Sequence, residues 1–168
     1  MPQSGRQPHA EAAPSGPGAL PAAAHGGPIS HAIFRLARVH RVSAGQLLRP
    51  IGLHPSQELL MMQLWDAGPQ RQADLVAMLE SDSATITRTI QRLERAGFVR
   101  RRPSTSDRRV TIVEPTAASQ ALRREVERVW NRLEELTVDG LDADERRIAL
   151  RVLERLESNL VRAAVEGD

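Results

Sequence analysis

One segment of this chain has the pattern of a β-hairpin, and the residues on both sides of it have the pattern of helices. The run from Phe98 to Arg102 fits a strand, residues 103–107 are turn formers, and Val110 to Val113 fits a returning strand. Apolar residues elsewhere recur at helical spacing between Gly and Pro breaks. The sequence therefore predicts a mostly α-helical fold with one small hairpin.

Helices are expected over residues 29–48, 55–67, 72–79, 83–95, 116–139 and 142–165. Pro55 is expected in the first turn of the second helix, and Thr116 is expected to cap the fifth. Gly97 directly follows the fourth helix, as a C-terminal glycine does, and Asp142 with Glu145 has the spacing of a capping box. Residues 81–83 supply N-cap candidates for the fourth helix.

Residues 1–28 contain six Pro and five Gly, and such a segment buries too little apolar surface to offset its ordering entropy. We expect a disordered tail there and a folded domain over residues 29–168. The chain has no apolar run long enough for a membrane span and no secretory-signal pattern. It has no Cys, which excludes disulfides and cysteine-bound zinc. A cytoplasmic location fits these features.

Positive charge is concentrated around the hairpin. Residues 81–109 contain eight Arg against Asp82, Glu94 and Asp107, whereas the whole chain has a net charge of only +2. Such a basic block in an otherwise mildly acidic chain indicates a localised anion-binding face.

The element order of helix, short helix, turn, helix and basic hairpin is that of a winged helix-turn-helix, whose second motif helix enters the DNA major groove. With Ile86 facing the core, Thr87, Arg88 and Gln91 point outward, and Thr85 and Arg92 lie on the flank. Arg88 is suited to guanine and Gln91 to adenine or phosphate. The alternative is an ordinary amphipathic surface helix.

The hairpin favours the DNA-binding interpretation, because an Arg at a wing tip is attracted to the minor groove. Arg109 and Arg108 are the candidates, and Asp107 is expected to hold a wing Arg in one rotamer or simply to initiate the turn. The predicted DNA contacts are Ser83, Thr85, Thr87, Arg88, Gln91, Arg92, Arg100, Arg101, Arg102, Asp107, Arg108 and Arg109. Among them, residues 92 and 100–102 are expected on phosphates.

The stretch from about Leu53 to Thr116 resembles the MarR family of bacterial transcriptional regulators. Residues 84–88 and 92–99 are similar to that family's recognition helix and wing entry. Residues 107–116 are similar to its wing signature, in which Asp-x-Arg precedes an apolar position and Leu-Thr. Pro115 replaces the usual Leu, and because Pro cannot donate a ladder hydrogen bond, the strand is expected to end one residue early.

The resemblance implies a homodimer that binds pseudo-palindromic double-stranded operators, most often as a repressor, and releases DNA on binding a small phenolic-type effector. It implies dimerisation helices over residues 29–50 and 116–165 and a DNA-binding lobe over residues 53–115. Apolar stripes outside the lobe agree with dimerisation, and Leu133 is expected in that interface. A monomeric helical bundle is the alternative.

An effector pocket is less well marked in the sequence. His40, Met61, Met62 and Trp65 are candidates, although Met and Trp at helical spacing also suit a plain core. The dispersed His31, His40 and His54 lack the compact spacing of a metal site, so no metal and no cofactor are expected. No phosphate-binding loop, HExxH motif or nucleophile signature indicates an enzyme. A winged-helix module that binds protein instead of specific DNA is the alternative function.

Overall fold

The structure of the chain, a computed structural model, describes residues 21–79 and 82–167. Two compact units divide the chain between Val39 and His40, and α1 crosses that division. The elements are η1 (Ala22–Ala24), α1 (Pro28–Leu48), η2 (Arg49–Ile51), α2 (Gln57–Ala67), β1 (Gln70–Arg71), α3 (Gln72–Met78), α4 (Ser83–Arg95), β2 (Val99–Pro103), β3 (Thr111–Pro115), α5 (Ser119–Thr137) and α6 (Ala143–Glu166).

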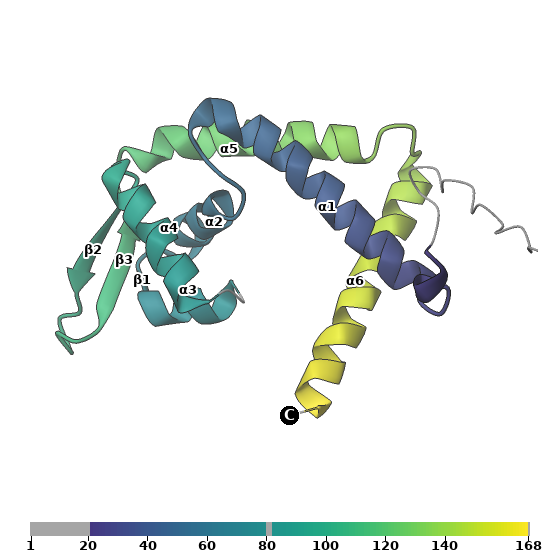
Figure 1. The fold of residues 1–168 in the computed structure, drawn as a ribbon. Coiled ribbons are helices and arrows are strands. Elements are labelled where there is room, and N and C mark those ends of the chain that lie inside the picture. The colour runs from purple at the N-terminus through teal and green to yellow at the C-terminus, as the bar shows by residue number, and fades with distance from the viewer. Residues whose placement is uncertain (1–20, 80–81, 168) are drawn as a thin grey trace, which may run out of the picture. The chain divides into compact units, whose positions relative to one another are not determined.

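The predicted fold class is confirmed, since helices dominate and a small antiparallel sheet carries the hairpin (Figure 1). The expected tail lies outside the described residues as far as residue 20, and η1 forms within its remaining part. No helix in residues 21–79 and 82–167 is both long and apolar enough to cross a bilayer.

The sheet has three strands in the order β1-β3-β2, one strand more than the sequence predicts. β1 pairs Gln70 with Val113 and Arg71 with Ile112, whereas β2 pairs with β3 along its whole length, from Val99 opposite Pro115 to Pro103 opposite Thr111. Two residues are too few to show the alternation of apolar and polar side chains that marks a strand, so β1 could not be predicted from the sequence. The short strand pairs with the middle of β3, while the hairpin tip, residues 104–110, extends beyond the paired strands (Figure 1).

One apolar core joins α2, α3, α4, α5 and the sheet. Leu60, Leu75, Ile90 and Val113 are each fully buried in it, although they come from four different elements. Burial of each such side chain contributes roughly 1.5–3 kcal/mol. This shared core fixes the direction in which α4 presents its opposite face.

β3 includes Pro115 and does not end one residue earlier, contrary to the sequence prediction, because the position of Pro115 in the ladder needs no N–H. In an antiparallel pair, directly opposed residues alternate between bonded and non-bonded positions. Thr116 N–H donates to the Phe98 carbonyl (3.0 Å), which leaves the Val99–Pro115 pair in a non-bonded position. β1 pairs only with residues 112 and 113, so no strand on the other side requires a donor from Pro115 either.

Two predicted helix starts are wrong. Thr116 does not cap α5, whose N-cap is Ala118; its hydroxyl instead donates to the carbonyl of Gly97 (2.6 Å) and ties the helix entry to the end of α4. Pro55 precedes α2, because Ser56 adopts a left-handed φ of 82° and the helix begins only at Gln57. At both positions an interaction outside the helix overrides the local preference. For Thr116 it is the hydrogen bond to Gly97, and for Pro55 it is the left-handed turn at Ser56.

The predicted capping box of α6 is confirmed. The Asp142 carboxylate accepts the N–H of Glu145 (2.9 Å), and the Glu145 carboxylate accepts the N–H of Asp142 (2.9 Å). Between its ends, α6 has no buried residue, and Val152, Leu153 and Leu160 are at least half exposed.

Candidate nucleic-acid interface

The helix α4 separates a buried apolar stripe from a polar and cationic face. Ile86, Ile90 and Leu93 are at most 3% exposed, as their spacing predicts. The other side of the helix carries the predicted contact residues. Of these, Ser83, Thr85, Arg88 and Arg92 are exposed, while Thr87 and Gln91 are half-buried.

The N-terminus of α4 is fixed by Asp82. Its carboxylate accepts the N–H of Thr85 at 2.8 Å, which satisfies one of the free donors of the first turn. Hydrogen bonding from Thr85, first from its side chain and then from this backbone N–H, holds the pKa of Asp82 below its ordinary value. Ser81, another predicted cap candidate, lies outside the described residues. The cap leaves the Ser83 and Thr85 side chains at the open front of the helix.

A second helix supports the outward face of α4 from the side. The amide nitrogen of Gln72, at the start of α3, donates to the Thr87 hydroxyl at 3.0 Å. Arg88 is exposed, and its Nε donates to the Ala84 carbonyl at 3.2 Å, so its terminal guanidinium nitrogens are not used in this bond. Arg88 thus retains the fork that suits a guanine edge.

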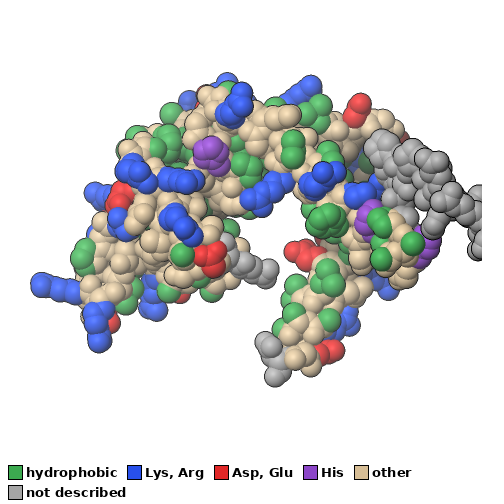
Figure 2. Space-filling model, in the orientation of Figure 1, with side chains coloured by type: hydrophobic (Ala, Val, Ile, Leu, Met, Phe, Trp, Pro, Cys, Tyr) green, Lys and Arg blue, Asp and Glu red, His purple; other side chains and the backbone are tan. Residues whose placement is uncertain are grey.

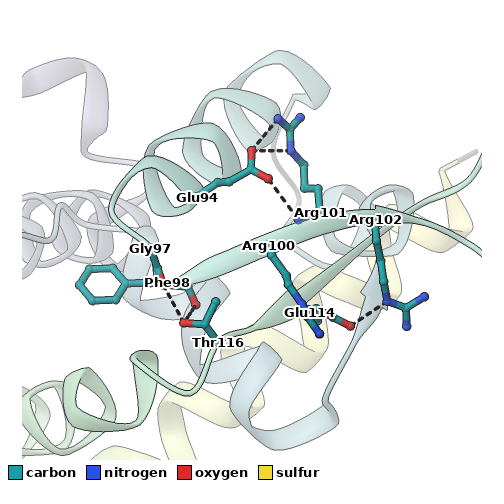
Figure 3. Close-up of polar contacts among 8 residues, drawn as sticks. All are labelled: Glu94, Gly97, Phe98, Arg100, Arg101, Arg102, Glu114 and Thr116. Carbon is teal, nitrogen blue, oxygen red and sulfur yellow. Dashed lines mark hydrogen bonds and ion pairs between the residues drawn. The ribbon is translucent and has the colours of Figure 1, made fainter.

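The three arginines of β2 are paired with carboxylates of the protein itself (Figure 3). Glu114 lies between Arg100 and Arg102 and accepts Nε of both, at 2.9 Å from Arg102. Glu94, in the last turn of α4, accepts Nε (2.9 Å), Nη2 (2.6 Å) and the backbone N–H (3.1 Å) of Arg101. The Glu94 pair joins β2 to α4, and the Glu114 pairs join β2 to β3 within the hairpin.

The wing tip is more open than its base. Ser104 N–H donates to the Val110 carbonyl (2.8 Å) and closes the loop, and the side chain of Arg109 is 93% exposed. The Asp107 carboxylate accepts the backbone N–H of Arg109 (2.9 Å) and lies 3.4 Å from its Nε. The sequence predicts two alternative roles for Asp107, to initiate the turn or to pair with a wing Arg. In the structure Asp107 does both. Figure 2 shows cationic side chains at the projecting end of the hairpin.

Several residues of this face were missed by sequence reasoning. Arg71 and Gln72, from β1 and α3, line a groove of about 400 Å³ with Ser83 and Arg109. Glu94 and Glu114 were not among the candidates, because their importance comes from arginines on neighbouring elements. For Glu114 a signal existed, since it faces Arg100 in the hairpin register, but that register is visible only once the pairing is known.

Known proteins share both the sequence pattern and the fold. Residues 53–111, which run from the residues before α2 to the first residue of β3, match the model of the MarR family. A MarR transcriptional regulator from Methanosarcina mazei Go1 is 27% identical, with a TM-score of 0.74 over 80% of this chain and 97% of that chain. Residues 53–111 of this chain form a MarR-family domain.

Two further MarR-fold structures were determined in functional contexts. A mutant MarR from E. coli, complexed with operator DNA, has a TM-score of 0.72 at 22% identity, over 79% of this chain and 96% of that one. Bordetella bronchiseptica BpsR, whose DNA binding is regulated by 6-hydroxynicotinic acid, has a TM-score of 0.69 at 24% identity, over 77% and 92%. The MarR-family domain and the matching MarR structures support a DNA-binding transcriptional regulator.

The chain also has a pocket of about 210 Å³ between α2 and α5. Of the predicted pocket residues, Met62 and Trp65 line it, together with Trp130 of α5. Met61 is fully buried and belongs to the core, and His40 is not part of the lining. Trp65 is held in place because its Nε1 donates to the buried Ser119 hydroxyl at 3.0 Å. The described residues contain no cluster of three or more metal-binding side chains.

Proposed function

We propose that this protein acts as a cytoplasmic homodimer that binds a pseudo-palindromic operator and represses transcription until a small effector binds. The observation that carries the proposal is the outward face of α4, a capped helix whose exposed hydroxyl and guanidinium groups adjoin a wing with an arginine tip. The operator-bound E. coli structure supports it, since its fold is the one found here.

Base reading is assigned to the front and centre of α4. Thr85, Thr87 and Arg88 lie on the first two turns, with Ser83 at the helix start and Gln91 one turn further. Helix-turn-helix proteins contact base edges mainly with the N-terminal part of the recognition helix. Arg88 forks onto guanine, and the hydroxyl groups allow the helix to approach the groove floor closely.

The sugar-phosphate contacts divide into two groups. Arg92 and Arg108 are exposed and make no ion pair within the described residues, so they are the favoured phosphate ligands. Arg109 is directed to the minor groove from the wing tip. Arg100, Arg101 and Arg102 were expected on phosphates too, but each would first have to leave its carboxylate partner.

Dimerisation is proposed through α1, α5 and α6, over residues 29–50 and 116–165. The α6 helix exposes a long apolar stripe, and α1 separately exposes Ile29, Phe34 and Leu36, each more than half accessible. Monomeric soluble proteins rarely expose contiguous apolar surface of this kind. Two lobes joined in this way would present their α4 helices to successive major grooves about one helical turn apart.

The pocket between α2 and α5 is the proposed effector site. Met62, Trp65 and Trp130 give it flat and adaptable apolar walls, while Asp66 and Arg123 supply polar groups at its edge. This combination suits a small aromatic compound with an acidic or hydroxyl substituent. Quenching of tryptophan fluorescence would measure effector binding, because both tryptophans of the chain, Trp65 and Trp130, line this pocket.

The function is tested with the full-length protein and labelled duplexes from the genomic neighbourhood of its gene. We expect one or a few fragments to bind far more tightly than a scrambled duplex of equal length, and a reporter driven by such a fragment to be repressed. Equal binding to all duplexes at several salt concentrations would reject operator recognition. Activation of the reporter in place of repression would reject the proposed sign of regulation alone.

A further inference from the structure

The carboxylates Glu94 and Glu114 compete with DNA phosphates for the arginines of β2. Figure 3 shows Glu94 reaching from α4 to the guanidinium of Arg101, and Glu114 placed beside Arg100 and Arg102. The side chains of Glu94 and Arg101 are each about one-third exposed, 33% and 34%, whereas that of Glu114 is only 9% exposed. Each arginine of β2 is therefore already paired with a carboxylate of the protein itself.

A paired arginine gains little from a phosphate. Non-specific DNA affinity comes mainly from cations that displace the counterions condensed on the duplex. If a phosphate replaced Glu94 on Arg101, the freed carboxylate would stand next to the DNA backbone, where it is repelled and takes up a cation from solution. The gain at Arg101 is thus cancelled at Glu94, and β2 adds almost nothing to binding that ignores sequence.

The pairs persist at neutral pH. The hydrogen bond from Arg101 holds the pKa of Glu94 below its ordinary value, and the hydrogen bond from Arg102, together with that from Arg100, does the same for the pKa of Glu114. Both groups are therefore ionised under all conditions in which the protein would meet DNA.

We infer that Glu94 and Glu114 are specificity-determining residues, which hold the β2 arginines away from phosphates and so keep non-specific affinity low. Discrimination is then left to α4 and the wing tip. There Arg88, Arg92 and Arg108 make no ion pair within the described residues, and Arg109 makes only a long, exposed one with Asp107 (3.4 Å). This inference rests on the proposed DNA-binding face. It matters because a regulator must find its operator among a large excess of competing sites, so the ratio of affinities counts for more than the affinity itself.

The geometry of Glu94 makes it the better position to test. Arg101, Arg102 and Arg108 line an open hollow of about 280 Å³ with Glu94, and a released Arg101 guanidinium would meet a phosphate there. Glu94→Gln keeps the side-chain length and an oxygen for the Arg101 backbone N–H, but removes the charge that neutralises the guanidinium. Glu94→Ala, which retains good helix propensity, serves as a second variant if the first folds poorly.

The experiment measures the affinity of the full-length protein for its operator and for a scrambled duplex, at several salt concentrations. For E94Q we expect several-fold tighter binding to the scrambled duplex and a smaller change at the operator, so the specificity ratio falls. The logarithm of the non-specific binding constant should fall more steeply with the logarithm of salt, by about 0.9 for each arginine released. The double variant E94Q/R101Q should return to the wild-type slope.

The matched control is Glu135→Gln, which removes the same charge from another exposed ion pair, with Arg132 on α5 (2.8 Å). It should leave both affinities unchanged. An E94Q protein with wild-type or weaker non-specific binding would overturn the inference, as would a double variant that keeps the steeper slope or a control that behaves like E94Q. If the wild type shows no operator preference, the proposed function fails instead. Melting curves confirm that each variant is folded.

Discussion

Asp107 orders the wing tip through contacts that are individually weak. Its carboxylate accepts the backbone N–H of Arg109, its carbonyl accepts the N–H of Val110 (3.0 Å), and its ion pair with Arg109 is largely exposed. Exposed ion pairs contribute only about 0–1 kcal/mol to stability. The value of Asp107 is therefore in limiting the conformations of Arg109 before DNA is bound, which reduces the entropy lost on binding.

Arg109→Ala should weaken operator binding by about 1–3 kcal/mol, the usual loss for a specific contact, and should make its salt dependence shallower. Fluorescence anisotropy at several salt concentrations measures both effects. Arg132→Ala, which removes an exposed arginine of α5, is the control and should change neither quantity. An Arg109 variant that binds as tightly as the wild type would exclude the wing tip from the interface.

Glu58 of α2 is a buried acid with an unusual pH effect. It is 5% exposed, and its Oε2 has no hydrogen-bond partner among the described residues. Burial raises its pKa above the ordinary value of 4.5, although backbone hydrogen bonds at Glu58 and Ser56 and, to a smaller extent, the charge of Arg41 oppose this. The folded protein thus binds this proton more tightly than the unfolded chain does, and stability is lost as the pH rises from 4.5 through the folded pKa.

Glu58→Gln should therefore raise the free energy of unfolding at pH 7, on the order of 1 kcal/mol, because it removes a buried charge that lacks a full set of partners. At pH 4, where Glu58 is protonated in the folded state, the difference should shrink. Urea unfolding at both pH values checks this. A variant that is less stable at pH 7 would show that ionised Glu58 stabilises the fold.

At the scale of elements, α4 depends on its cap. Asp82→Ala should lower the melting temperature and weaken operator binding several-fold, because the first turn of α4 loses the bond to Thr85 and carries the base-reading side chains. Asp142→Ala removes the corresponding cap from α6 and is the matched control. It should lower the melting temperature while leaving operator affinity unchanged at protein concentrations that keep the dimer intact. Equal effects of the two variants on binding would remove any special role of the α4 cap.

Elements with a strong local signal could be predicted from the sequence, and elements defined by tertiary contacts could not. The stripe of Ile86, Ile90 and Leu93 predicts α4 with its bounds, and the Asp142 box predicts the start of α6. β1 exists only because β3 supplies its partners, and Thr116 is diverted from its cap position by the Gly97 carbonyl.

The candidate interface follows the same division. Exposed Arg88, Arg92 and Arg109 could be located from helix periodicity and the hairpin pattern alone. The neutralisation of Arg101 by Glu94 could not, because the two residues are seven positions apart and belong to different elements. Sequence reasoning counts charges, whereas the field that a duplex meets depends on which of those charges are already paired.

At the scale of the whole molecule, the apolar residues separate into two sets. Leu122, Val126 and Leu133 of α5 are buried within the chain's own core, whereas Leu153 and Leu160 of α6 are at least half exposed. The first set stabilises the single chain. The second set would contribute to stability only in the proposed dimer. The oligomeric state is therefore tested on α6 and not, as the sequence suggested, at Leu133.

Leu160→Asp should dissociate the dimer and leave each chain folded, because Leu160 is 67% exposed and its side chain makes no contribution to the core cluster. Light scattering coupled to gel filtration should report the mass of one chain, about 18.5 kDa, against twice that for the wild type. Operator affinity should fall sharply, because a single lobe contacts only half of a two-fold site. Leu133→Asp, in contrast, should lower the melting temperature, since it places a charge in the core. If the Leu160 variant remains dimeric, the stripe on α6 faces something other than a second copy of this chain; if the wild type is already monomeric, the two-fold arrangement itself is wrong.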